Sequence, residues 1–142
     1  MQTVAEILNS KGREVWAVRP DDTVLDALRT MAEHDTGAVV VMDGERLAGI
    51  FTERDYARKV VLIGRASRDL PVRDIMTHSV VCVTPDRSIN ECMALMTERR
   101  LRHLPVLDHK RVVGMVSIGD LVKATIEEQE FTISQLRLYV TS

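Results

Sequence analysis

The sequence predicts an α+β fold made of two copies of one unit, each with the order strand, helix, strand, strand, helix. Two observations support this prediction. When the 142-residue chain is shifted by 65 positions, Ala17–Tyr56 aligns with Cys82–Leu121 without a gap, and ten of the 40 pairs are identical. In both copies, the hydrophobic residues also follow the same succession of strand and helix spacings. The chain is therefore a tandem repeat of a unit of about 60 residues.

Each copy begins with a short strand and an amphipathic helix. Trp16–Val18 and Val80–Val83 are short β-prone runs that are each followed by a Pro-Asp turn signal. Hydrophobic residues within 24–31 and 89–96 then fall at i, i+3, i+4 and i+7, which is the spacing of one helix face. Each helix starts with a capping-box pattern: Thr23 with Asp26, and Ser88 with Glu91.

A hairpin and a second helix complete each copy. Val39–Val41 and Leu47–Phe51 flank Asp43-Gly44, a strong signal for a tight hairpin turn. The second copy repeats this pattern with Leu104–Leu107, a turn at Asp108–Arg111, and Val112–Val116. We expect the closing helices to begin near Thr52 and Ser117.

These elements divide the chain into a first domain at residues 1–64, a polar linker at 65–71, a second domain at 72–126 and a C-terminal helix at 127–142. Within that last segment Ile133, Leu136 and Val140 share one helix face. We expect this face to pack on the module itself or against another subunit.

The composition excludes several classes of protein. The net charge is only −2, from 19 Lys and Arg against 21 Asp and Glu, whereas proteins that coat nucleic acids usually have a basic surplus. No apolar run approaches the roughly 18 residues of a membrane span, and the first residues do not resemble a signal peptide. Cys82 and Cys92 both have apolar neighbours, which favours buried reduced thiols. We therefore expect a cytoplasmic protein that does not bind membranes.

The most informative segments are 49–55 and 114–120, which both read Gly-apolar-apolar-hydroxyl-x-x-Asp where a strand turns into a helix. One interpretation is structural: the hydroxyl and the Asp form a capping box, and the Gly permits close packing. The other interpretation is a ligand site, because a helix N-terminus favours polar or anionic groups. An Asp there can accept hydrogen bonds from both hydroxyls of a ribose, while Arg102 or His103 attracts a phosphate.

These paired motifs, together with Arg102-His103-Leu104-Pro105-Val106-Leu107-Asp108, resemble a tandem pair of cystathionine-beta-synthase (CBS) domains, also called a Bateman module, of the small stand-alone bacterial kind. The resemblance covers nearly the whole chain. It implies two β-α-β-β-α repeats packed about a pseudo-twofold axis. It also implies two clefts that bind adenosine compounds such as AMP, ADP, ATP, NAD(H) or S-adenosylmethionine as regulatory ligands.

The resemblance implies a crosswise distribution of ligand-binding residues between the two clefts. One cleft would combine Thr52, Arg54 and Asp55 with Arg102, His103 and the segment Thr77–Val81. The other would combine Ser117, Gly119 and Asp120 with Thr36, Gly37, Ala38 and the segment Lys11–Trp16. The first set is the more cationic, so the two clefts are expected to be unequal.

The sequence offers no catalytic constellation. It contains no Gly-rich phosphate loop, and its four His residues have no zinc-type spacing with the two Cys residues. We therefore expect a non-catalytic sensor of energy or redox state without a catalytic cofactor or metal, which forms a homodimer and acts on an effector protein. Two alternatives stay open: a nucleic-acid-binding module, from the basic residues near 65–68 and 99–103, and a protein-interaction module without a ligand.

Overall fold

The computed structural model describes residues 2–141, so Met1 and Ser142, at the ends of the expected first domain and C-terminal helix, lie outside the described residues. The predicted α+β fold is confirmed, with helices and two small sheets. The chain forms two compact units. The repeat-1 unit comprises Glu14–Val81 and His109–Val113, and the repeat-2 unit comprises the described residues of Met1–Arg13, Cys82–Asp108 and Gly114–Ser142. Within residues 2–141, no helix is long and apolar enough to cross a membrane.

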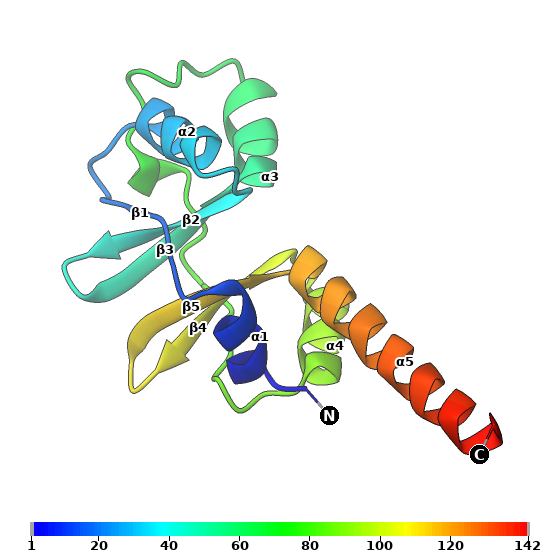
Figure 1. Ribbon diagram of the computed structural model, residues 1–142. Coiled ribbons are helices and arrows are strands. Elements are labelled where there is room, and N and C mark those ends of the chain that lie inside the picture. The colour runs from blue at the N-terminus through cyan, green and yellow to red at the C-terminus, as the bar shows by residue number, and fades with distance from the viewer. Residues whose placement is uncertain (1, 142) are drawn as a thin grey trace. The chain divides into compact units, whose positions relative to one another are not determined.

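The repeat-1 unit is a three-stranded sheet with helices packed on it (Figure 1). The sheet order is β1-β2-β3, in which β1 is parallel to β2 and β2 is antiparallel to β3. The elements are β1 (Ala17–Val18), α2 (Val24–Glu33), β2 (Ala38–Asp43), β3 (Arg46–Thr52), α3 (Glu53–Tyr56), a π-helical turn (Ala57–Val61) and a 3-10 turn (Val72–Asp74). The expected capping box of Thr23 and Asp26 is confirmed at the start of α2.

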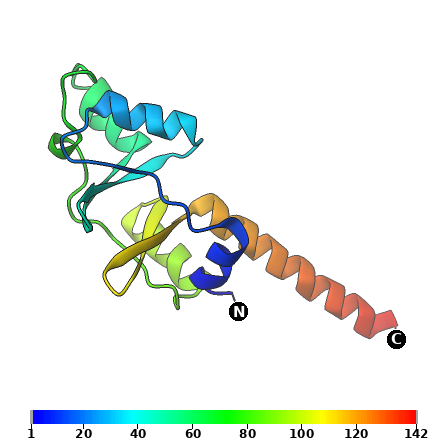
Figure 2. The same ribbon diagram turned by 60° about the vertical axis from the view of Figure 1, so that its left-hand side comes forward.

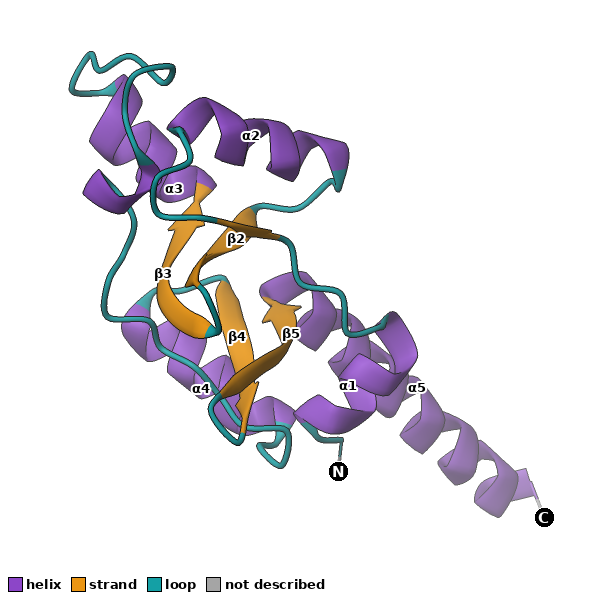
Figure 3. Ribbon diagram, turned by 90° about the vertical axis from the view of Figure 1, so that its left-hand side faces the viewer, coloured by secondary structure: helices purple, strands orange, loops and turns teal. Residues whose placement is uncertain are grey.

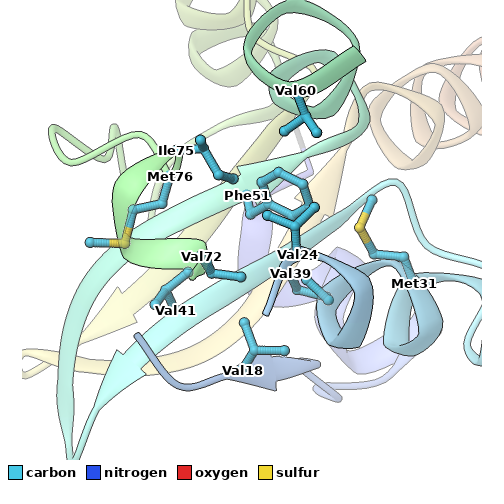
Figure 4. Packing of buried hydrophobic residues seen from close by; sticks show 11 residues of the cluster. Val18, Val24, Met31, Val39, Val41, Phe51, Val60, Val72, Ile75 and Met76 are labelled. Carbon is cyan, nitrogen blue, oxygen red and sulfur yellow. The ribbon is translucent and has the colours of Figure 1, made fainter. Parts of the chain in front are cut away.

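The core of this unit lies between the sheet and its helices (Figure 4). Val39 and Val41 alternate along β2 toward this core, as the period of two in a strand requires. Phe51 of β3 and Val24 of α2, both fully buried, pack in the same cluster. The hydrophobic spacing noted in the sequence therefore brings together a helix face and a sheet face.

The repeat-2 unit contains the equivalent elements of the second copy, with a two-stranded sheet (Figure 3). Its elements are α1 (Val4–Lys11), α4 (Ile89–Arg99), β4 (His103–Asp108), the part of β5 (Arg111–Ser117) from Gly114 onward, and α5 (Ile118–Thr141). Leu121 and Ala124, in the first half of α5, are buried, whereas the second half of α5 extends away from the rest of the unit (Figure 2). The expected C-terminal helix is thus the continuation of the helix that begins after Ser117.

The segment that precedes each repeat packs on the elements of the other repeat. The amide of Val4 donates to the carbonyl of Arg87 (2.8 Å), and the amide of Val72 donates to the backbone carbonyl of Asp22 (2.8 Å). The compact units therefore do not coincide with the two linear repeats, because each contains the leading segment of the other.

The prediction of a strand over Val80–Val83 is wrong, because the structure has a single bridge residue there and no strand of that length. The β-bridge of this segment is at Val83, which is parallel to Val106. A tight turn, closed by a hydrogen bond from the Val80 amide to the His78 carbonyl (3.1 Å), interrupts the extended chain before it. Pro85, which has no amide hydrogen to donate, follows.

Candidate functional site

The first strand-to-helix corner, formed by Thr52 and Asp55, is a closed capping box. The Asp55 Oδ2 accepts from the Thr52 amide (3.0 Å) and hydroxyl (3.2 Å), and the Asp55 amide donates to the Thr52 Oγ1 (3.2 Å). The other oxygen, Oδ1, accepts from the Thr77 hydroxyl (3.2 Å) and forms an ion pair with Lys59 Nζ (3.0 Å). Both carboxylate oxygens are therefore engaged, and the side chain is only 11% exposed.

The second corner, formed by Ser117 and Asp120, repeats the capping box but leaves the carboxylate more open. The Asp120 Oδ2 accepts from the Ser117 amide (2.8 Å), and the Asp120 amide donates to the Ser117 Oγ (3.1 Å). Lys11 Nζ also donates to Oδ2 (2.7 Å). None of these bonds ends on Oδ1, and the Asp120 side chain is 23% exposed.

The pKa of Asp120 is lowered from its usual value. Partial burial has the largest effect and acts to raise the pKa, but it is outweighed by several favourable interactions of the carboxylate. These are the hydrogen bond and charge of Lys11 and the hydrogen bonds from Ser117. Asp120 is thus held as a carboxylate, which can only accept hydrogen bonds.

The ligand interpretation of these helix N-termini needs correction, because it requires backbone amides that are free to bind a ligand. The amide of Glu53 donates to the carbonyl of Gly37 (3.1 Å), and the amide of Ile118 donates to the carbonyl of Arg102 (2.9 Å). The amide of each corner Asp is bonded to the capping hydroxyl. Because the residue just before the first strand of each hairpin supplies a carbonyl to the first helical turn, the carboxylate is the main polar group that a corner can offer to a ligand.

The residues expected at the ligand sites are divided between the two units. The repeat-1 unit holds Trp16, Thr36, Gly37, Ala38, Thr52, Arg54, Asp55, Thr77 and Val81, and the repeat-2 unit holds Lys11, Arg102, His103, Ser117, Gly119 and Asp120. Within these units, the structure brings Thr77 to Asp55, and Lys11 to Asp120. The crosswise sharing of residues stays a prediction.

Trp16, expected as a wall for adenine, stacks on another ring of its own unit. The ring centroids of Trp16 and His34 are 3.5 Å apart, and the ring planes differ by 6°. One face of the indole is therefore already covered by an imidazole, so a base that stacked on Trp16 would have to use the other face or displace His34.

Lys59 was missed in the sequence. Its Nζ binds both Asp55 and the Ile75 carbonyl (3.2 Å), so it belongs to the first corner. The signal available was its position four residues after Asp55 in an expected helix, where opposite charges lie on the same face.

The glycine of each motif permits close packing of the exchanged leading segment, as the structural interpretation expects. A Cβ at Gly49 would lie 2.5 Å from Met76 Sδ and 2.9 Å from the Thr77 carbonyl oxygen. A Cβ at Gly114 would lie 2.7 Å from both methyl carbons of Leu8. Met76 and Leu8 hold matching positions in the two leading segments.

A hollow elsewhere in the repeat-1 unit does not involve the corner. It has a volume of about 760 Å³ and is lined by the segments Ala17–Asp22 and Met42–Gly44, at the end of the β2–β3 hairpin opposite Thr52. Asp21, Asp22 and Asp43 make its wall predominantly acidic, which disfavours a phosphorylated ligand. In the part of the chain that the structure describes, no cluster of three His, Cys, Asp or Glu side chains is placed to hold a metal ion.

Known proteins resemble this chain along most of its length. The CBS domain family matches residues 4–62 and 72–127. The CBS domain-containing protein CBSX3, mitochondrial, of Arabidopsis thaliana is 43% identical, over 97% of this chain and 71% of its own length.

Two solved structures share the fold. A putative signal-transduction protein with CBS domains from Burkholderia ambifaria has 54% identity and a TM-score of 0.87, over 90% of this chain and 96% of its own. The CBS domain pair of protein MJ0100, solved with 5-methylthioadenosine and S-adenosyl-L-methionine, has a TM-score of 0.79 at 21% identity, over 90% and 98% of the two chains. Because the family matches both repeats and both corner motifs lie within them, this chain belongs to the CBS domain family, as a tandem pair that forms a regulatory module.

Proposed function

We propose that this chain is a sensor of cellular energy or redox state that binds an adenosine-containing small molecule and transmits its presence to an effector protein. The ligand class comprises AMP, ADP, ATP, NAD(H) and S-adenosylmethionine. The corner carboxylates accept hydrogen bonds from the hydroxyls of the ribose. The observation that carries the proposal is the ionised Asp120 carboxylate, whose Oδ2 is held by Ser117 and Lys11 while Oδ1 accepts neither of these bonds.

The chemistry of the corner favours a diol over a phosphate. A carboxylate repels a phosphate group placed directly on it, whereas two adjacent hydroxyls can each donate to it. The ligands of the MJ0100 domain pair, 5-methylthioadenosine and S-adenosyl-L-methionine, both contain a ribose attached to adenine, which supports this ligand class.

A calorimetric titration with adenosine and with 2′-deoxyadenosine tests the proposal. We expect Asp120→Asn to weaken adenosine binding about tenfold or more, because a hydrogen bond to a charged group contributes about 1.5–3 kcal/mol. The same variant should change the affinity for 2′-deoxyadenosine much less, because one hydroxyl of the diol is missing.

Asp26→Asn is a matched control, because Asp26 closes the same kind of capping box at the start of α2 and belongs to neither corner motif. We expect it to lower the melting temperature without changing adenosine affinity. If Asp120→Asn behaves in the same way, the corner is only a helix cap. If an RNA binds and adenosine nucleotides do not displace it, the nucleic-acid alternative is favoured instead.

The same proposal includes a homodimer. Two segments that follow the corners have exposed hydrophobic side chains: Val61–Ile63 after α3, and Ile126, Ile133 and Leu136 on α5. Exposed apolar patches of this kind usually mark an interaction surface. A second copy of the chain would cover them.

A further inference from the structure

A lysine contacts each corner aspartate, but the two lysines take different carboxylate oxygens. Lys11 Nζ bonds to Asp120 Oδ2, the oxygen that already caps α5, and to the Met115 carbonyl (2.9 Å). Lys59 Nζ bonds to Asp55 Oδ1, the oxygen that does not cap α3, and to the Ile75 carbonyl. The two lysines therefore affect the accepting capacity of the two carboxylates differently.

The difference decides how many acceptor positions remain for a ligand. A carboxylate has about four lone-pair directions. Asp55 receives the Thr52 amide and hydroxyl on Oδ2, and the Thr77 hydroxyl and Lys59 on Oδ1, so all four are used. The bonds from the Ser117 amide and from Lys11 Nζ to Asp120 both end on Oδ2. A ribose can thus reach Oδ1 of Asp120 without displacing either donor, whereas at Asp55 it must first displace a protein group.

Lys59 is special to the first repeat. It lies in the π-helical turn Ala57–Val61, and π-helical turns are frequent at functional sites. The matching position of the second repeat is Ala124, a buried residue of a continuous α-helix, which cannot supply a cation to Asp120.

We propose that Lys59 is a specificity-determining residue that keeps the Asp55 corner closed, so that the Asp120 corner takes the first adenosine ligand. This inference rests on the proposed function. Of the groups bonded to Asp55 Oδ1, Lys59 is the one a ligand displaces, because its side chain is 42% exposed and its ammonium can move into water. Exposed ion pairs contribute at most about 1 kcal/mol, which corresponds to about a fivefold change in affinity.

The experiment isolates the Asp55 corner in an Asp120→Asn background and measures adenosine affinity by calorimetric titration. We expect Lys59→Met to tighten adenosine binding there by about threefold to fivefold, because the competing ammonium is gone. Adenosine is the probe because it has no charge, so the loss of a cation does not alter its attraction to the site.

Two matched variants serve as controls. Arg58→Met removes a neighbouring exposed cation of the same turn and should leave the affinity unchanged. Lys11→Met, measured in an Asp55→Asn background, should not tighten adenosine binding, because Lys11 does not occupy Oδ1. A circular dichroism melt of each variant confirms that the titrated protein is folded.

The outcomes separate the two proposals. If adenosine binds but Lys59→Met has no more effect than Arg58→Met, the role of Lys59 is wrong and the proposed function stands. If Asp55→Asn weakens the first binding event of the wild type and Asp120→Asn does not, the assignment of the first site is wrong. If no adenosine compound binds to the wild type or to any variant, the proposed function is overturned together with this inference.

Discussion

The glycines of the two corner motifs allow a sharp test of how the exchanged leading segments pack. A methyl group at Gly49 would overlap Met76 Sδ at 2.5 Å and Cγ at 2.8 Å, and would also lie 2.9 Å from a backbone atom, the Thr77 carbonyl oxygen. At Gly114, the three nearest atoms all belong to the side chain of Leu8, at 2.7 to 3.3 Å. A side chain can change rotamer, whereas the backbone at Thr77 is held by paired hydrogen bonds with Ile50 (3.0 and 2.9 Å).

We therefore expect Gly49→Ala to lower the free energy of unfolding by about 2–3 kcal/mol, toward the upper end of the cost of overpacking a core. For a chain of this size, that is a fall of roughly 6–10 °C in melting temperature. Gly114→Ala should cost about 1 kcal/mol or less, because Leu8 can adjust and alanine has a smaller loss of backbone entropy than glycine.

Urea denaturation followed by circular dichroism measures these differences, with Gly119→Ala as the control. A Cβ at Gly119 would meet only Ser117 Oγ at 3.6 Å, an ordinary contact, and alanine is the better helix former, so this variant should be neutral or slightly stabilising. Equal losses for Gly49→Ala and Gly114→Ala, or a larger loss for Gly114→Ala, would refute the argument from close packing.

Three further predictions concern charge and assembly. The pKa of Asp120 is lower in the folded than in the unfolded protein, so the stabilisation by this carboxylate is present above the unfolded pKa, roughly 4, and is lost as the pH falls through the folded pKa. In urea titrations, the difference in unfolding free energy between wild type and Asp120→Asn should therefore shrink between pH 7 and pH 3. A difference that stays constant over this range contradicts the prediction. Light scattering at micromolar concentration should give the mass of a dimer for the wild type and of a monomer for Leu136→Asp on the exposed face of α5, whereas a wild-type monomer overturns the proposed homodimer. Arg102→Ala should weaken AMP binding far more than adenosine binding, with the loss shrinking at high salt, because a guanidinium can pair with a phosphate; equal losses for the two ligands would exclude that role.

The local structure could be predicted from the sequence because it depends on neighbours in the chain. The capping boxes at Thr23 and Ser88 formed as expected, since a hydroxyl at the N-cap and a carboxylate three residues later lie close together in the first turn of a helix. The hairpin turn after Asp43 was equally predictable, because Gly44 adopts the positive φ of 64° that such a turn needs. The repeat followed from the 65-residue spacing, and the resemblance to the CBS family rested on the two corner motifs and the segment Arg102–Asp108.

The state of each corner carboxylate was decided by tertiary structure. Lys11 and Asp120 are 109 residues apart, and no periodicity relates them; they meet because α1 packs in the repeat-2 unit rather than with the repeat it precedes. Thr77 reaches Asp55 by the same exchange of leading segments, 22 residues away.

The sequence by itself therefore determined that both corners have a hydroxyl, a carboxylate and a glycine, since these are local requirements of a capped helix after a strand. Only the tertiary structure decided that Asp55 has both oxygens occupied, while the bonds from the Ser117 amide and Lys11 to Asp120 end on Oδ2. The physical reason is that hydrogen-bond saturation depends on which distant donors the packing brings within about 3 Å, and packing is a property of the whole chain.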